Sequence, residues 1–491
     1  IRSAGEYESA LQMQGILLDP EARKKIIAEQ VAGKQAEVGA ARDVDAGLLE
    51  EVTQLVEAPT ALCGSFDPSH LRLPPEVLIS VMKKHQRYFP VHSAEGNLMH
   101  YFIAVRNGGE EYLDVVTDGN EQVIRARFAD AAFFISEDLK NRLEDFLPRL
   151  ATLTFQLKLG SMLDKNQRIE RLVEQLIPIF GLSEIEASTA RRAAHLSKAD
   201  LVTNMVVEMT ALQGIMGRFY ALSCGENAAV AQAIYEHYLP RSTGDALPGS
   251  MPGLVIGLAD RLDTLIGLFA AGLAPTGTKD PFAQRRAAQG LVQALGLGNL
   301  DFDLREGLRL AAGYLPISAS VEAQASCLEF ITGRLRSYLL ETGDGSRYDI
   351  VDAVLAEQQA NPAGVLRGVR ELSAWVNRPD WATILPAYAR CVRITRDQKE
   401  RFAIYPEAFS DAAEKDLYAA ILQAGSAQRR EGSVGDFFGC FLPLIPLINR
   451  FFEAVLVMAE DATVKSNRLG MLQQVAGLAS GVADFSRLEG F

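Results

Sequence analysis

Residues 168–177 of this 491-residue chain read RIERLVEQLI. Their apolar members recur every three or four positions, which is the period of an amphipathic α-helix. The same period dominates from residue 118 to about residue 298 and is interrupted mainly at glycines. It predicts an all-helical domain over residues 151–300. The apolar members of the opening stretch are Ile169, Leu172, Val173, Leu176 and Ile177.

The region before this domain has a different pattern. Leu73-Pro-Pro-Glu76 predicts the start of a short helix, and Tyr88–His92 and Leu98–Val105 are typical of two strands joined by a polar turn. We therefore expect a small α+β unit at residues 51–150. Residues 1–50 are charged and helical in pattern, and we expect them to be connector helices.

The helical pattern continues to the end of the chain. It predicts a helical body segment at residues 301–380 and a terminal helical block at residues 381–491. At roughly 150 residues per domain, the length suggests about three domains. The predicted fold is therefore mainly α and multidomain.

The composition limits the classes of function. There are 49 Lys and Arg against 62 Asp and Glu, a net charge of −13, so nucleic-acid binding would have to use local basic patches. The five cysteines form no C-x-x-C pair, which indicates reduced thiols and a cytoplasmic protein. The most apolar stretch, residues 437–448, is short and contains two prolines, so we expect no membrane span, and we expect no signal peptide.

The first candidate site lies at residues 272–279, GLAPTGTK, which nearly match a phosphate-binding loop. Such a loop needs Lys directly after its second Gly, and Thr278 intervenes here. The next two residues, Asp-Pro, predict an N-cap and first turn of a helix. Lys279, Arg285 and Arg286 would then surround a helix N-terminus, an arrangement suited to a phosphate. The alternative is a capped surface helix with solvated arginines.

The second candidate resembles the metal site of HD-type phosphohydrolases. Asp200 follows Ala199 where those enzymes have a His-Asp pair, and Asp260 lies in an Ala-Asp-x-Leu context. Without the histidine, carboxylates alone leave the coordination of a catalytic metal incomplete. We therefore expect no metal here and a structural role for both aspartates. His195, four residues before Ala199, keeps a metal site open as an alternative.

The third candidate is a basic cluster in the α+β unit. Lys83, Lys84 and Arg87 precede Tyr88 and Phe89 at a predicted junction of helix and strand. Cations beside aromatic rings can bind RNA phosphates and stack a base. A solvated helix end followed by two core aromatics is the alternative.

The fourth candidate lies at residues 367–401, which hold eight Lys and Arg against four Asp and Glu on an acidic chain. Arg390, Arg393 and Arg396 recur every three residues, so they share one side of a helix. Trp375 and Tyr388 lie among them. This pattern predicts an RNA-binding surface, with a solvated helix face as the alternative.

Catalytic motifs are absent from the sequence. It contains no H-I-G-H or K-M-S-K-S element, no Gly-x-Ser-x-Gly elbow and no dinucleotide fingerprint. We therefore expect no complete catalytic centre in this chain.

Several long strings resemble the beta subunit of bacterial-type glycyl-tRNA synthetase, the α/β heterotetrameric class. They occur in the family's order and cover nearly the whole chain, which makes them far more specific than the short motifs above. The strings include TLTFQLKLGSMLDKNQRIERL (152–172), SKADLVTNMVVEMTALQGIMGRFYAL (197–222), YEHYLPR (235–241), LADRLDTLIG (258–267), PTGTKDPFAQRRAA (275–288) and FFEAVLVMAEDATVKSNRLGMLQQV (451–475).

The resemblance implies a fold and a function. It implies an HD-like helical domain at residues 151–300 and a DALR-type anticodon-binding bundle at residues 381–491. It also implies that most of the family's N-terminal domain is missing here. The chain would hold tRNA(Gly), while glycine, ATP and Mg²⁺ bind at a separate alpha subunit in an α2β2 enzyme. No cofactor on this chain, no DNA and no membrane are expected.

The resemblance also suggests roles for the candidate residues. Lys279, Arg285 and Arg286 would contact the acceptor side of the tRNA, and Lys83, Lys84 and Arg87 are further candidate RNA contacts. The family usually has Asn where this chain has Arg393. An HD-type phosphohydrolase and an RNA-free helical scaffold are the alternative functions. The anticodon side would be contacted by Arg390, Arg393, Lys465, Asn467 and Arg468.

Overall fold

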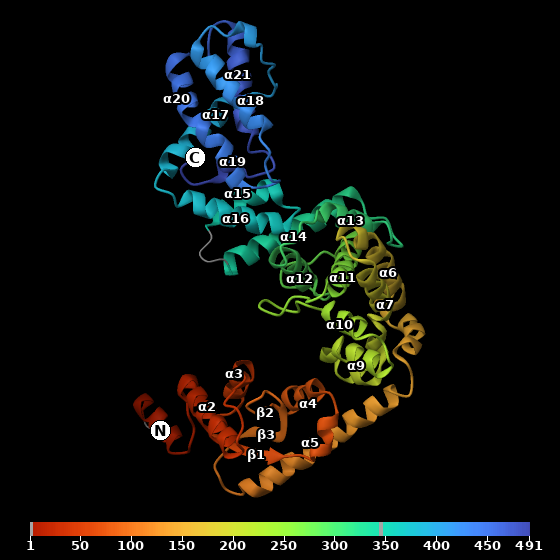
Figure 1. Ribbon diagram of the computed structural model, residues 1–491. Coiled ribbons are helices and arrows are strands. Elements are labelled where there is room, and N and C mark those ends of the chain that lie inside the picture. Colours follow the sequence, from red (N-terminus) through yellow and green to blue (C-terminus); the bar gives the residue numbers. More distant parts are fainter. Residues whose placement is uncertain (1–2, 343–346) are drawn as a thin grey trace. The chain divides into compact units, whose positions relative to one another are not determined.

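The computed structural model describes residues 3–342 and 347–491. Helices make up 65% of the structure and strands 6%, which confirms the mainly α class with a small sheet. The chain divides into two compact units (Figure 1). Unit 1 comprises Ile1–Thr154, Ser161–Asn166 and Arg192–Tyr235, and unit 2 comprises Phe155–Gly160, Gln167–Arg191 and Glu236–Phe491.

The bounds of the α-helices in the described part of the chain are as follows: α1 Tyr7–Gln12, α2 Pro20–Glu37, α3 Ala46–Leu55, α4 Pro75–Val81, α5 Leu113–Asp138, α6 Met162–Ile179, α7 Glu184–Leu196, α8 Asn204–Glu208, α9 Ile215–Ser223, α10 Ala228–Glu236, α11 Met251–Ala270, α12 Gln284–Leu297, α13 Leu304–Ala312, α14 Val321–Thr342, α15 Tyr348–Gln358, α16 Pro362–Val376, α17 Trp381–Thr395, α18 Ala412–Ser426, α19 Val434–Phe441, α20 Ile445–Ala454 and α21 Ala462–Gly477. The strands are β1 Pro59–Ser65, β2 Phe89–His92, β3 Leu98–Asn107, β4 Thr154–Gln156 and β5 Gly160–Ser161.

Unit 1 is built on an antiparallel sheet of order β1-β3-β2. The β2-β3 pair confirms the two strands predicted from the sequence, and α4 confirms the helix predicted to begin near Pro74. Strand β1 was not predicted. Its register places Leu62 opposite Ala104, so its partner lies some forty residues further along the chain.

Helices α2 and α3 cover one face of this sheet. Ile27 and Val31 of α2 are fully buried in one core with Val91 and Ile103 of the sheet. Apolar side chains four residues apart on a helix lie on the same face, which accounts for this packing. Helices α2 and α3 therefore form a layer of unit 1. The division of the chain into five domains, with connector helices at residues 1–50, stays a prediction.

On another side of the sheet, α5 and the short helices that follow complete unit 1. Phe66 meets Phe128 of α5 edge to face, with 4.9 Å between ring centroids. At the end of α5 the buried carboxylate of Asp138 accepts hydrogen bonds from the backbone N–H of Met205 at 3.0 Å and from the hydroxyl of Tyr220 at 2.7 Å. These bonds tie α5 to α8 and α9.

Unit 2 is centred on α11, most of whose residues are buried. Helices α12, α13 and α14 pack against it. A buried ion pair joins α6 to α11, with Arg168 Nε 2.6 Å from Asp263 Oδ1. A helix that is apolar nearly all round is typical of the centre of a large helical domain.

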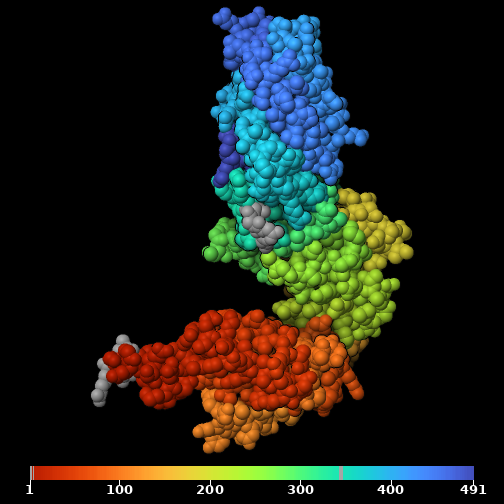
Figure 2. All heavy atoms as spheres, turned by 60° about the vertical axis from the view of Figure 1, so that its left-hand side comes forward, coloured from red at the N-terminus to blue at the C-terminus, as the bar shows by residue number. Residues whose placement is uncertain are grey.

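Helices α15 to α21 form the terminal part of unit 2. Tyr388 of α17 packs edge to face against Phe437 and Phe441 of α19, and against Phe485 near the end of the chain. Helix α15 joins this body through Gln358, whose amide donates to the carbonyl of Val482 at 2.7 Å. Figure 2 shows the atoms of this part of the chain, from cyan to dark blue, packed together in one body.

One helical run in this body, Val434–Ala454, is long and apolar enough to cross a membrane by length and composition, with a mean hydropathy of 1.3. It is longer than residues 437–448, on which the prediction of no membrane span was based, so length does not exclude a span. A third of its most apolar window is buried. Phe437, Phe441 and Phe451 of this run lie in the bundle core.

Candidate nucleic-acid interface

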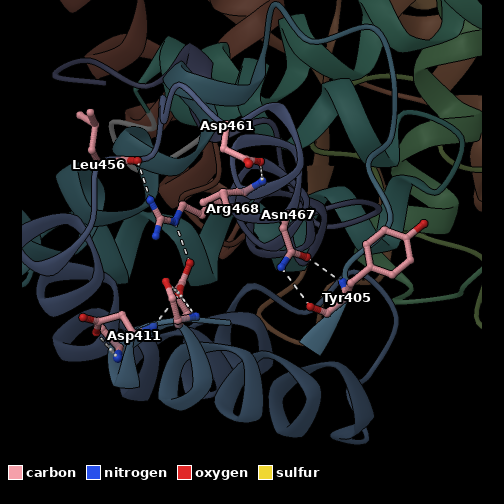
Figure 3. A network of polar contacts seen from close by, with 10 residues as sticks. Tyr405, Asp411, Leu456, Asp461, Asn467 and Arg468 are labelled. Carbon is pink, nitrogen blue, oxygen red and sulfur yellow. Dashed lines mark hydrogen bonds and ion pairs between the residues drawn. The ribbon is translucent and has the colours of Figure 1, made fainter. Parts of the chain in front are cut away.

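The start of α21 holds three of the predicted tRNA-contacting residues, Lys465, Asn467 and Arg468. Figure 3 shows two of them, Asn467 and Arg468, together with Asp461. Asp461 is the N-cap, and its carboxylate accepts from the backbone N–H groups of Thr463 and Val464 at 2.8 and 3.0 Å. Such a cap satisfies N–H groups that have no partner inside the helix. Helix α21 is therefore fixed from its first turn.

Asn467 and Arg468 point into the bundle. The Asn467 amide both donates to and accepts from the backbone of Tyr405, at 3.0 and 2.7 Å. Arg468 Nε donates to Glu414 Oε1 at 2.7 Å, and its Nη1 donates to the carbonyl of Leu456 at 2.9 Å. Burial would raise the pKa of Glu414, but hydrogen bonds from Arg468 and from the backbone at the start of α18 outweigh it and lower that pKa.

The predicted RNA contact of these two residues does not fit their burial. Asn467 is 2% exposed and Arg468 8% exposed, and both have their polar atoms engaged by protein groups. Lys465 is half-buried in the first turn of the same helix. Of the three, Lys465 is the one whose side chain reaches the surface.

Arg390 and Arg393 of α17 are exposed, as a contact with RNA requires. The Arg390 guanidinium lies over the ring of Phe452 at 4.3 Å from its centroid, and its Nη1 donates to Asn449 Oδ1 at 3.2 Å. The guanidinium of Arg393 is 5.5 Å from the ring centroid of Phe491. Within residues 347–491, neither arginine has a carboxylate partner, so each keeps its charge available at the surface.

Lys279 lies in the loop between α11 and α12, and the other two predicted acceptor-side cations, Arg285 and Arg286, lie in the first turn of α12. Lys279 and Arg286 are exposed, and Arg285 donates to the carbonyl of Gly277 at 2.5 Å. The helix begins at Gln284, later than the Asp-Pro pair predicted. The carboxylate of Asp280 nevertheless caps it, because it accepts from the N–H groups of Gln284 and Arg285 at 2.8 and 2.9 Å. A carboxylate thus already occupies the helix N-terminus at which a phosphate was predicted.

The basic cluster of unit 1 is largely neutralised. Lys83 forms an ion pair with Asp45, and Arg87 Nε lies 2.7 Å from Glu51 Oε1. Lys84 is exposed. The cluster occupies a π-helical turn, Met82–Gln86, that ends at Arg87 in the left-handed region with φ 54°. It therefore holds α3 against the sheet layer through two ion pairs.

The two degenerate HD positions fall in different units, Asp200 in unit 1 and Asp260 on α11 of unit 2. Asp200 is fully buried, and its Oδ2 accepts from the N–H groups of Gly214 and Gly217 at 2.6 and 3.0 Å. Burial raises the pKa of Asp200 to about 6. Across the two described segments, no group of three or more His, Cys, Asp or Glu is arranged to hold a metal ion.

Sequence reasoning missed the role of Arg261. Arg261 lies on α11, and its buried guanidinium donates to several backbone carbonyls. These bonds link residues 258–267, LADRLDTLIG, to residues 235–241, YEHYLPR. Burial lowers the pKa of Arg261 to about 10. A cation on an otherwise apolar helix was the available sign of such a buried anchor. The acceptors are the carbonyls of His237, Tyr238, Leu239, Pro240 and Gly257, at 2.8 to 3.1 Å.

Comparison with known proteins gives the family. The family model described as glycyl-tRNA synthetase beta subunit matches residues 1–356. The chain belongs to this family. It is 41% identical to the glycine–tRNA ligase beta subunit of Moorella thermoacetica over 99% of the chain and 71% of that protein. The glycine–tRNA ligase beta subunits of Desulforudis audaxviator and Clostridioides difficile are 41% and 38% identical, with the same coverage of 99% and 71%.

Membership in an aminoacyl-tRNA synthetase family confirms the resemblance drawn from the sequence strings. A beta subunit of this ligase implies an alpha subunit and a tRNA as partners. The matched residues include the Arg261 anchor and the loop with Lys279. The terminal bundle lies beyond the family model but within the aligned length of the relatives.

Proposed function

We propose that this chain is the tRNA-binding subunit of glycine–tRNA ligase and holds tRNA(Gly) while glycine is attached at an active site on the alpha subunit. The observation that carries the proposal is 41% identity to a beta subunit over 99% of the chain. The lack of catalytic motifs in the sequence also supports it. A subunit that positions RNA requires exposed cations, not an active site of its own.

The exposed cations support two contact surfaces. Lys279 and Arg286 lie in the loop before α12 and at its start, and Arg390 and Arg393 lie on α17. On a chain with net charge −13, such local clusters are where an RNA backbone would bind. The first pair would meet phosphates near the acceptor end, and the second would meet the anticodon arm.

The architecture we propose follows the family. Residues 151–300 would correspond to an HD-like domain without a working metal site, and residues 381–491 to a DALR-type anticodon-binding bundle. Two observations support the first assignment: Ala199 stands beside the buried Asp200, and the carboxylate of Asp200 is held by backbone N–H groups. The buried aromatic core around Tyr388 supports the second.

The remaining parts of the proposal concern the assembly. The chain would act in an α2β2 enzyme in the cytoplasm, with ATP and Mg²⁺ bound by the alpha subunit and no cofactor bound here. The absence of a His ligand next to Asp200 is consistent with this division of labour.

The test compares the chain alone with the chain plus the alpha subunit. Glycine-dependent exchange of pyrophosphate into ATP is expected from the mixture and not from this chain alone. Transfer of glycine to tRNA(Gly) should require this chain. Exchange by the isolated chain would contradict the proposal, and so would tRNA binding that does not weaken with salt, because phosphate contacts release counterions.

A further inference from the structure

Helices α17 and α20 pack against each other in the terminal bundle. Arg390 comes from α17. Asn449 and Phe452 come from α20, three residues apart and therefore on neighbouring positions of one helix face. The Arg390 guanidinium stacks on the Phe452 ring at 4.3 Å and donates to Asn449 Oδ1 at 3.2 Å. The three side chains form one unit, called here the α17/α20 platform.

Two contacts restrict the side chains of the platform. Phe452 is half-buried and meets the fully buried Phe451 edge to face, with 5.8 Å between centroids. The bond to Asn449 restricts the Arg390 guanidinium, whose central carbon lies over the aromatic ring. The Arg390 side chain is nevertheless exposed, so it remains accessible to a ligand from the solvent side.

A second arginine in the terminal part of unit 2 also lies over an aromatic ring, but its charge is neutralised. Arg378 lies over Trp375 at the same distance of 4.3 Å, but its two nitrogens contact the carboxylate of Asp380 at 2.8 and 2.7 Å. Arg390 has no carboxylate partner among the residues described in the bundle. The charge of Arg378 is thus neutralised by a carboxylate, whereas the planar guanidinium of Arg390 keeps its positive charge.

We propose that the α17/α20 platform binds one unstacked base of the tRNA, which stacks on the open face of the Arg390 guanidinium. This inference rests on the proposed function and names the surface that receives the RNA loop. Unpaired bases stack on arginine planes and aromatic rings in this way. Asn449 hydrogen bonds to the edge of the base, since its amide has two N–H donors and a second acceptor lone pair beyond the bond to Arg390. Arg393, three residues further along α17, contacts the adjacent phosphate.

The experiment measures the affinity of the full chain for a stem-loop RNA that carries the anticodon loop of tRNA(Gly). A series of stem-loops replaces one loop nucleotide at a time by an abasic nucleotide. The variants are Arg390→Lys, which keeps the charge but removes the plane, and Phe452→Leu, which removes the ring. Arg378→Lys is the matched control. Far-ultraviolet circular dichroism confirms that each variant is folded, since Arg378 lies over Trp375 and its replacement alters tryptophan emission locally.

Arg390→Lys is expected to weaken binding of the intact stem-loop by about tenfold, since stacking of one base contributes about 1–3 kcal/mol. Arg378→Lys should leave the affinity unchanged. For one abasic stem-loop, Arg390→Lys and Phe452→Leu should cause no further loss, because the base they stack is already gone. For the other stem-loops, the loss should persist.

Three results would overturn the platform. The first is an equal affinity of wild type and Arg390→Lys for the intact stem-loop. In that case, salt-dependent binding of tRNA(Gly) by the wild type would still support the proposed function. Equal losses with Arg390→Lys on every abasic stem-loop would indicate a phosphate contact without stacking. No binding of tRNA(Gly) by the wild type at low salt would refute both the platform and the proposed function.

Discussion

Replacing Arg468 by methionine separates a folding role from an RNA-binding role at the start of α21. Methionine has a similar length but no charge, so Glu414 would keep a buried carboxylate without its ion-pair partner. The side chains of Arg468 and Glu414 are 10% and 2% exposed, and their contact is 2.7 Å long. Removing one partner of a buried pair costs about 3–5 kcal/mol, and the carbonyl of Leu456 would also lose its donor. We therefore expect Arg468→Met to lower the free energy of unfolding of the bundle by about that amount.

Urea unfolding followed by tryptophan emission measures the stability of the terminal bundle, which contains Arg468. The chain has two tryptophans, Trp375 and Trp381, and both pack against Phe438 of α19. Their emission therefore reports the terminal bundle and not unit 1. The double variant Arg468→Met/Glu414→Gln should lose less than the sum of its single variants, because neither then leaves an unpaired buried charge.

Arg487→Met is the matched control for charge removal. Its contact with Asp484 is 3.1 Å long, but the Arg487 side chain is 53% exposed, so its loss should cost below about 1 kcal/mol. Folded Arg468→Met should bind tRNA(Gly) as tightly as the wild type. An unchanged unfolding midpoint together with weaker tRNA binding would refute the structural role and restore the RNA contact predicted from the sequence.

Further predictions concern single residues. Asp200 has a folded pKa of about 6, above the unfolded value, so its contribution to stability is complete below pH about 4 and is lost as pH rises through about 6. In urea titrations at several pH values, the free energy of unfolding of Asp200→Asn should lack about 3 kcal/mol of the pH dependence of the wild type. Curves of this free energy against pH that run parallel for the two proteins would contradict the prediction. Arg261→Lys should lower the thermal midpoint, because an ammonium has too few donors for five carbonyls, each costing about 1–3 kcal/mol if left without a partner. Gly290→Ala should cost about 1–3 kcal/mol, because its Cβ would lie 2.7 Å from Arg261 Nε, whereas Gly333→Ala, with nothing within 4 Å of its Cβ, should stabilise α14. Arg286→Ala should weaken all tRNAs alike and reduce the salt slope by about one, and a loss confined to tRNA(Gly) would count against a phosphate contact.

Local patterns were enough to predict the helices and one hairpin. The polar turn between residues 93 and 97 joins β2 and β3, so the signals for this pair all lie within about twenty residues. Strand β1 has no such neighbour, since it pairs with β3 across more than thirty residues. Pairing over such a distance depends on how the chain packs and leaves no periodic trace in the sequence.

The packing of α2 against the sheet could not be predicted from the sequence for a related reason. Ile27 and Val31 are surrounded in sequence by charged residues, so α2 has a narrow apolar stripe that is typical of a solvated helix. Whether such a stripe faces water or a sheet depends on residues that come later in the chain. The start of α12 was displaced because Ala283 adopts a left-handed conformation, φ 53°, that no local motif predicts, while Asp280 still caps the helix from outside it.

Two arginines in the strings that resemble the family are not placed to touch RNA. Arg261 and Arg468 both lie in family-like strings, and both are buried against carbonyls or a carboxylate. Buried arginines of this kind are costly to replace, because the groups they pair with would be left buried without a partner. Arg390, in contrast, differs from its surroundings by being planar, exposed and without a carboxylate partner in the described bundle. Substitution of Arg261 or Arg468 would therefore measure stability, whereas substitution of an exposed cation such as Arg286 or Arg390 would measure binding of the RNA.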